Sequence, residues 1–106
     1  MVLREIHKKF LSVSGQPYHI VIRSEFQEEL LITEFLITKD NQPLWMYRLG
    51  LVNAVDHEKV IEKMEMIGIR FMQNMILTER FIRSSGKIDS LNEELQDGDW
   101  YSLPEL

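Results

Sequence analysis

The sequence predicts an α+β fold: a three-stranded, or four-stranded, antiparallel meander followed by one long C-terminal helix and a short acidic tail. Three segments between residues 18 and 52 are rich in β-branched and aromatic residues and are separated by turn-forming residues, as in antiparallel strands. Residues 53–83 repeat apolar side chains at spacings of three and four, the period of an amphipathic helix. The length of 106 residues suits one domain, expected over residues 1–96, with the tail over residues 97–106.

The N-terminal segment, residues 2–13, is ambiguous. Its apolar residues follow helical spacing, so a short helix is favoured, with a first strand as the alternative. Strands are expected over residues 18–23, 30–38 and 44–52, and an alternative assignment extends the first of these to Phe26. Turns are expected at residues 14–17 and 39–43, where glycine, proline, asparagine and aspartate gather.

The second predicted hairpin has one register that places opposite charges across the strands. A slip by one residue would mix core positions with solvent positions. In the favoured register the odd-numbered side chains form the better core face. The even-numbered face is also mostly apolar, so a first helix or a partner must cover it. The predicted cross-strand neighbours are Glu34 and Arg48, Phe35 and Tyr47, and Ile37 and Trp45.

The long helix is expected to begin at Asn53 or Asp56, because either side chain is a suitable N-cap, and to end near residues 84–86. About 30 residues at roughly 1.5 Å each give a rod of about 45 Å, whereas a domain of this size is roughly 33 Å across. The helix therefore bends or breaks near Gly68, or its far end packs on another chain, and the second outcome is favoured. Beside the apolar stripe that is expected to pack on the sheet, the helix has a second apolar flank. This flank and two aromatic residues of the tail are the predicted partner-binding residues: Met66, Ile69, Ile76, Leu77, Phe81, Trp100 and Tyr101.

The net charge of -5 comes from the C-terminal end of the chain. Residues 87–106 hold six acids and one base, whereas residues 1–86 hold eleven of each and are neutral. A neutral body does not suit a surface that binds duplex nucleic acid. A short helix is expected around residues 91–95, and the following acidic-aromatic tail either docks on the domain through Trp100 and Tyr101 or stays free as a recognition peptide.

The sequence holds no cysteine and no apolar run long enough to span a membrane, and charges stand where a signal peptide needs an apolar core. A cytoplasmic protein is therefore expected. None of its three histidines has a second histidine four residues away, and no nucleophile motif or glycine-rich phosphate loop is present. We expect no catalytic residue, no metal ligand and no cofactor, and hence not an enzyme.

The expected order of elements is similar to that of the small acidic secretion-chaperone-like domains, in layout only. The wide apolar face of the long helix points to a partner, most simply a second copy, and the resemblance, which transfers no individual residue, implies a dimeric, non-catalytic protein that binds a client. The leading hypothesis is therefore a non-enzymatic homodimer that binds another protein. Two alternatives remain open. One is a single-strand nucleic-acid binder that presents aromatics beside bases, and the other is a small-molecule pocket between sheet and helix. The residues considered for nucleic acid are Tyr18, Trp45 and Tyr47 beside Arg23 and Arg48.

Overall fold

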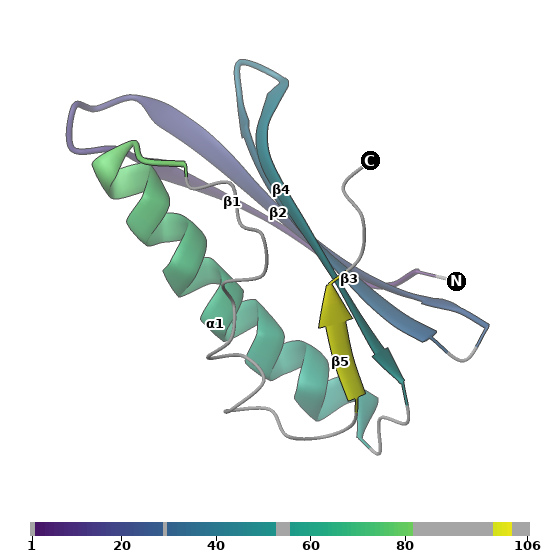
Figure 1. Cartoon of the computed structure of the whole chain (residues 1–106). Coiled ribbons are helices and arrows are strands. Elements are labelled where there is room, and N and C mark those ends of the chain that lie inside the picture. Colours follow the sequence, from purple (N-terminus) through teal and green to yellow (C-terminus); the bar gives the residue numbers. More distant parts are fainter. Residues whose placement is uncertain (1, 29, 53–55, 82–98, 103–106) are drawn as a thin grey trace.

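The computed structural model describes residues 2–28, 30–52, 56–81 and 99–102 of the chain. Four consecutive strands precede one helix: β1 (Val2–Leu11), β2 (Pro17–Gln27), β3 (Leu30–Lys39) and β4 (Gln42–Val52), followed by α1 (His57–Thr78). A short strand, β5 (Asp99–Ser102), pairs antiparallel with β4, so the sheet order is β1-β2-β3-β4-β5. Figure 1 shows α1 lying across one face of this sheet. The predicted α+β meander followed by a long helix is confirmed, in its four-stranded form.

The N-terminal segment forms strand β1, so the favoured short helix was wrong and the strand alternative was right. β1 is an edge strand, and most of its side chains are exposed. Ile6 and Phe10 are half-buried and lie opposite Ile22 and Tyr18 of β2, whose side chains face the helix. An edge strand needs few buried positions, so its sequence does not have to alternate cleanly.

The hairpin of β3 and β4 has the predicted register. Glu34 lies opposite Arg48, Phe35 opposite Tyr47, and Ile37 opposite Trp45. The odd-numbered residues from Leu31 to Ile37 and from Trp45 to Leu51 are buried, which confirms the predicted core face. The turn falls within the predicted segment. Its central residues, Asp40 and Asn41, have φ values of 51° and 61°, the left-handed conformation that tight hairpins need and that aspartate and asparagine tolerate.

Helix α1 begins after Asp56, whose side chain accepts a hydrogen bond from the backbone N–H of Lys59 at 3.2 Å. It ends at Thr78, because Glu79 adopts the left-handed conformation and the N–H groups of Glu79 and Arg80 turn back to carbonyls of the last turn. The helix has 22 residues, about 33 Å, and the molecule is 42 Å long. The predicted overhang is therefore wrong for α1, and Gly68 lies inside the helix rather than at a break.

Several predictions concern residues that the structure does not describe. These are the short helix at 91–95 and most of the tail. The predicted helix end near residues 84–86 is wrong, because α1 ends at Thr78, and of the two predicted N-caps, Asn53 and Asp56, the helix has Asp56. Within the tail, residues 99–102 dock on the sheet as backbone, with Trp100 opposite Leu51. The predicted burial of the Trp100 and Tyr101 side chains lies outside the described features.

Candidate interaction surface

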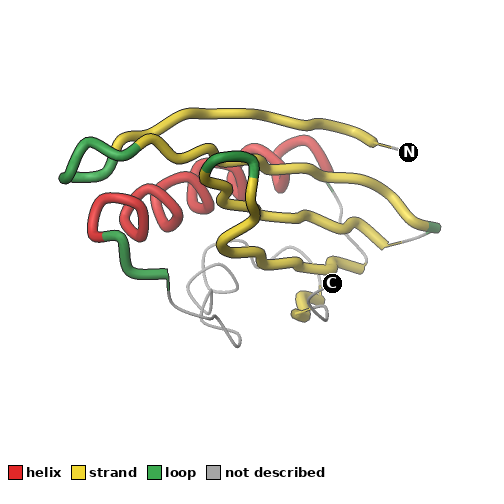
Figure 2. The backbone as a smooth tube through the Cα atoms, turned by 90° about the horizontal axis from the view of Figure 1, so that it is seen from above, coloured by secondary structure: helices red, strands yellow, loops and turns green. Residues whose placement is uncertain are grey.

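A groove separates strand β1 from the flank of helix α1. Figure 2 shows β1 along one edge of the sheet, with α1 running beside it on one face. The larger part of the groove is a hollow of about 710 Å³ between four residues of each element. Strand β1 contributes Arg4, Ile6, His7 and Lys8, and the helix contributes Glu65, Met66, Ile69 and Arg70.

A second hollow of about 500 Å³ lies at the start of the helix. Leu3 and Arg4 line it from the β1 side, and it contains the edge-to-face contact between Phe26 and His57, whose ring centroids are 4.5 Å apart. Arg4 also lines the larger hollow, so this residue joins the two parts of the groove. The groove therefore runs along most of β1, with apolar and charged side chains mixed on its walls.

An ion pair crosses the groove between Arg4 and Glu65. Arg4 Nε lies 2.9 Å from Glu65 Oε2, and the Glu65 side chain is only 8% exposed. Burial raises the pKa of Glu65, and the attraction of Arg4 opposes this shift only in part. The ion pair thus connects β1 to the helix. Keeping the buried Glu65 carboxylate charged nevertheless costs desolvation free energy.

The predicted partner-binding residues of the helix divide into two groups. Met66 is 55% exposed, Leu77 is 41% exposed, and Ile69 is half-buried at the wall of the groove. Ile76 is fully buried in the core and presents no surface. Phe81 lies beyond the helix, half-buried, with its ring centroid 5.5 Å from that of Tyr18. Three of the five helix-side residues therefore contribute to an accessible surface.

Sequence reasoning missed the residues of β1 that face this flank. Arg4, Ile6 and Lys8 face the helix flank, whereas Glu5, His7 and Lys9 lie on the face of the sheet opposite the helix. Leu3 and Leu11 are 37% and 58% exposed. β1 is the last strand on its side of the sheet, and within the described ranges no strand pairs with its outer edge. The signal was present in the charged residues between positions 4 and 9, but it can be interpreted only once this segment is assigned as a strand.

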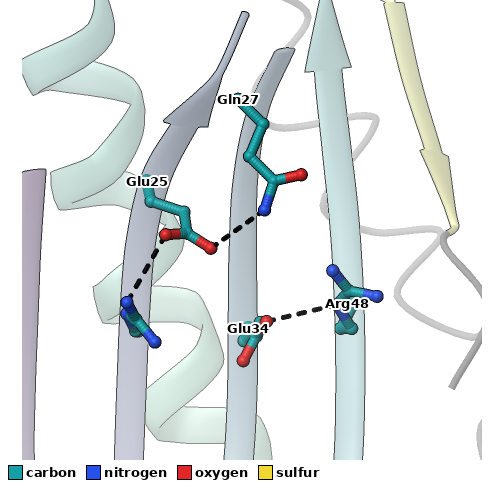
Figure 3. A network of polar contacts seen from close by, with 5 residues as sticks. Glu25, Gln27, Glu34 and Arg48 are labelled. Atoms are coloured by element: carbon teal, nitrogen blue, oxygen red, sulfur yellow. Dashed lines mark hydrogen bonds and ion pairs between the residues drawn. The ribbon is translucent and has the colours of Figure 1, made fainter. Parts of the chain in front are cut away.

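A row of alternating charges crosses the face of the sheet opposite the helix. Glu5 of β1 lies opposite Arg23 of β2, Arg23 opposite Glu34 of β3, and Glu34 opposite Arg48 of β4. Figure 3 shows part of this network, in which Arg48 Nε is 3.3 Å from Glu34 Oε1. The row explains how the mostly apolar β3–β4 part of this face accommodates charge. The first helix expected to cover this face does not exist, because those residues form β1.

The same geometry separates the residues considered for single-strand nucleic-acid binding. Tyr18, Trp45 and Tyr47 are buried on the helix side of the sheet. Arg23 and Arg48 belong to the charge row on the opposite face. Stacking of bases needs aromatic faces beside basic groups, and these five residues do not provide that combination.

A polar cluster closes the far end of the helix. The Tyr18 hydroxyl donates a hydrogen bond to Glu79 Oε2 at 2.8 Å, and Ser14 donates to the other carboxylate oxygen. These hydrogen bonds lower the pKa of Glu79, whereas burial, followed by the contact with Glu79, raises the pKa of Tyr18. The neutral Tyr18 hydroxyl and the Glu79 carboxylate therefore form a structural contact that connects the β1–β2 turn region to the end of the helix.

Among the described residues, no three histidine, aspartate or glutamate side chains are grouped so that they could bind a metal ion. The single described helix is not both long and apolar enough to cross a membrane.

Comparison of the chain with protein-family models, with curated proteins and with solved structures finds no match.

Proposed function

We propose that this chain is a non-enzymatic protein-binding module that acts as a homodimer through the β1–α1 surface. One observation carries the proposal: the exposed apolar flank of α1 lies beside the outer strand of the sheet. Met66 is 55% exposed, and the hollow next to it is lined by Ile6 and Ile69. A strand edge and an apolar strip at the same place are two of the features by which proteins recognise other chains.

The energetics favour a partner at this surface. Fully burying an apolar side chain such as methionine or leucine contributes about 1.5–3 kcal/mol. Met66 and Leu77 are partly exposed in the single chain, and a twofold dimer would bury each of them twice. Charged side chains at the rim, including Lys8 and Arg70, are suited to set orientation rather than affinity.

The test measures mass in solution. Light scattering at micromolar concentration is expected to report a dimer, and Met66→Glu is expected to weaken it because the variant places a charge in the buried flank. Ile69→Asp and Leu77→Asp are expected to act in the same direction. Leu44→Glu is the matched control, since Leu44 is 47% exposed on β4, far along the sheet from β1.

Each outcome bears on the proposal. A dimer that Met66→Glu dissociates and Leu44→Glu does not would support it. A wild-type chain that stays monomeric up to high micromolar concentration would contradict the homodimer. Equal weakening by both variants would place the interface elsewhere. Circular dichroism and thermal unfolding of each variant separate loss of association from loss of fold.

A further inference from the structure

We infer that the homodimer forms by antiparallel pairing of β1 with β1 of a second copy, with His7 opposite the partner's His7. The two sheets then become one continuous sheet, and both helices lie on the same face. This inference rests on the proposed function and adds the register of its interface. It is drawn from the charges and exposed apolar residues of the edge strand.

Symmetry limits the choice of register. In a twofold antiparallel pair, the sequence numbers of two opposite residues always add up to the same total. Opposite side chains point to the same face of the sheet, and residues of equal parity point to the same face within one strand, so an even total places both helices on one side of the sheet. One residue of β1 then lies opposite its own counterpart. The central candidates are Glu5, Ile6, His7 and Lys8, because a centre nearer either end pairs only a few residues of β1.

Only the centre at His7 brings unlike charges together and avoids like charges. It places Glu5 opposite the partner's Lys9, and this contact occurs twice. A centre at Ile6 places Arg4 opposite the partner's Lys8. Centres at Glu5 and Lys8 place each of those charges opposite itself. Opposite charges across antiparallel strands stabilise pairing, and like charges oppose it.

The same register brings two exposed apolar residues to the same level of the strand pair. Leu3 and Leu11 are both exposed large hydrophobic side chains on the edge strand. With His7 at the centre, Leu11 lies level with the partner's Leu3, which stands at the register shift between Val2 and Arg4 and lines the hollow at the start of the helix. On the helix side, the centre lies next to the hollow lined by Ile6, Met66 and Ile69, so the hollows of the two copies adjoin across the axis. The exposed flank of α1 is thereby brought towards its counterpart.

In the proposed dimer, the charge row on the face opposite the helix continues across the interface. Within one chain the row runs Arg48, Glu34, Arg23, Glu5, with alternating sign, and it ends at the edge of the sheet. The partner's Lys9 supplies the next charge in the alternation. Within the strand, Glu5 Oε1 lies 3.1 Å from His7 Nε2. This contact holds the Glu5 carboxylate beside the twofold axis of the proposed dimer.

A charge-exchange experiment tests the pairing of Glu5 with Lys9. Lys9→Glu alone sets two carboxylates opposite each other, and Glu5→Lys alone sets two ammonium groups opposite each other. Each is expected to raise the dimer Kd by about tenfold or more, since two contacts change sign. The two variants mixed in equal amounts are expected to form a heterodimer, and the double variant is expected to dimerise like the wild type. Lys63→Glu on the helix, outside both hollows, is the charge control.

Cysteine cross-linking tests the centre itself, because the chain contains no native cysteine. Opposite Cα atoms in antiparallel strands are about 4.5–5.5 Å apart, within the range of a disulfide. His7→Cys is therefore expected to form a covalent dimer under mild oxidation. Glu5→Cys is not, because its two copies would be about 13 Å apart along the strands. A mixture of Glu5→Cys and Lys9→Cys is expected to cross-link as a heterodimer.

The outcomes separate this inference from the proposed function. A dimeric wild type in which Glu5→Cys cross-links and His7→Cys does not would overturn the register while leaving the homodimer intact. A dimer that none of these cysteines links, and that Met66→Glu still dissociates, would place the contact on the helices alone. A monomeric wild type would contradict both proposals. Rescue by the mixed charge variants, together with cross-linking at His7, would establish the register.

Discussion

Gly68→Ala is expected to destabilise this protein, although alanine is the better helix former. Alanine would by itself stabilise the interior of a helix by about 1 kcal/mol relative to glycine. A Cβ at position 68, however, would lie 2.3 Å from Cε1 and 2.6 Å from Cδ1 of Phe35. The Phe35 ring is fully buried, and its cross-strand neighbours Ile22 and Tyr47 are buried as well, so it has little room to move aside.

Overpacking of this kind costs about 1–3 kcal/mol, and an overlap this deep belongs at the upper end. After the helix gain of about 1 kcal/mol is subtracted, the expected net loss is about 1–2 kcal/mol. For a domain of this size that lowers Tm by about 4–8 °C for each kcal/mol. Urea unfolding and a thermal melt measure the two quantities independently.

A double-mutant cycle identifies the cause of the loss. Phe35→Leu removes the ring, so Gly68→Ala is expected to cost less in that background, with a coupling of about 0.5 kcal/mol or more. Asn74→Ala, at an exposed position of α1, is the control and is expected to stabilise by a few tenths of a kcal/mol. A Gly68→Ala protein as stable as the wild type would refute the close packing of α1 on β3.

Three further predictions concern single polar contacts, each measured by urea unfolding. Burial raises the pKa of Glu65, so the stability of the wild type is expected to rise as pH falls through that raised pKa. The Glu65→Gln variant is expected to lose this pH dependence and to be at least as stable as the wild type at neutral pH. Hydrogen bonds from two hydroxyls lower the pKa of Glu79, so its contribution to the free energy of unfolding is present above the ordinary carboxyl pKa and is lost as pH falls through the lowered pKa. The Glu79→Gln variant is expected not to show this loss of stability in acid. Thr33→Val leaves the buried Ser24 hydroxyl, 2.9 Å from Thr33 Oγ1, without that partner and is expected to cost about 1–3 kcal/mol, whereas Thr33→Val combined with Ser24→Ala is expected to be nearly neutral.

The β3–β4 hairpin could be predicted because its information is local. Two strands joined by a short turn have few possible registers, and the pair of Glu34 and Arg48 distinguishes one of them. The core face followed from the same choice, because a sheet with one covered face buries alternate residues. Both predictions use residues no more than about twenty positions apart in the sequence.

The end of the helix could not be predicted, because distant residues determine it. The apolar period continues through Phe81 and Ile82, so the sequence by itself favours a longer helix. Glu79 instead adopts the left-handed conformation, and its carboxylate accepts hydrogen bonds from Ser14 and Tyr18, more than sixty residues earlier in the chain. Tertiary contacts that compensate an unfavourable local conformation leave no periodic signal.

The candidate surface could be predicted only on its helical side. Met66, Ile69 and Leu77 follow from the width of the apolar stripe. Ile76 was assigned to the same flank, yet adjacent helix residues point about 100° apart, and this one turns into the core. The β1 side of the surface was not predicted, because residues 2–13 were expected to form a helix. In a helix Glu5 and Lys9 would be neighbours on one face, whereas in β1 they belong to the edge of a sheet.

The charges of β1 bear on selectivity as well as on affinity. Lysines on an edge strand ordinarily prevent unwanted pairing with other strands. In β1 the same residues oppose most registers of self-pairing, because Lys8 would meet Arg4 or a second Lys8, and Glu5 would meet a second Glu5. Only the register centred on His7 changes Lys9 from a repelling charge into a partner for Glu5. An edge that is protected against other strands and open to one arrangement of its own copy would therefore limit aggregation without preventing dimerisation.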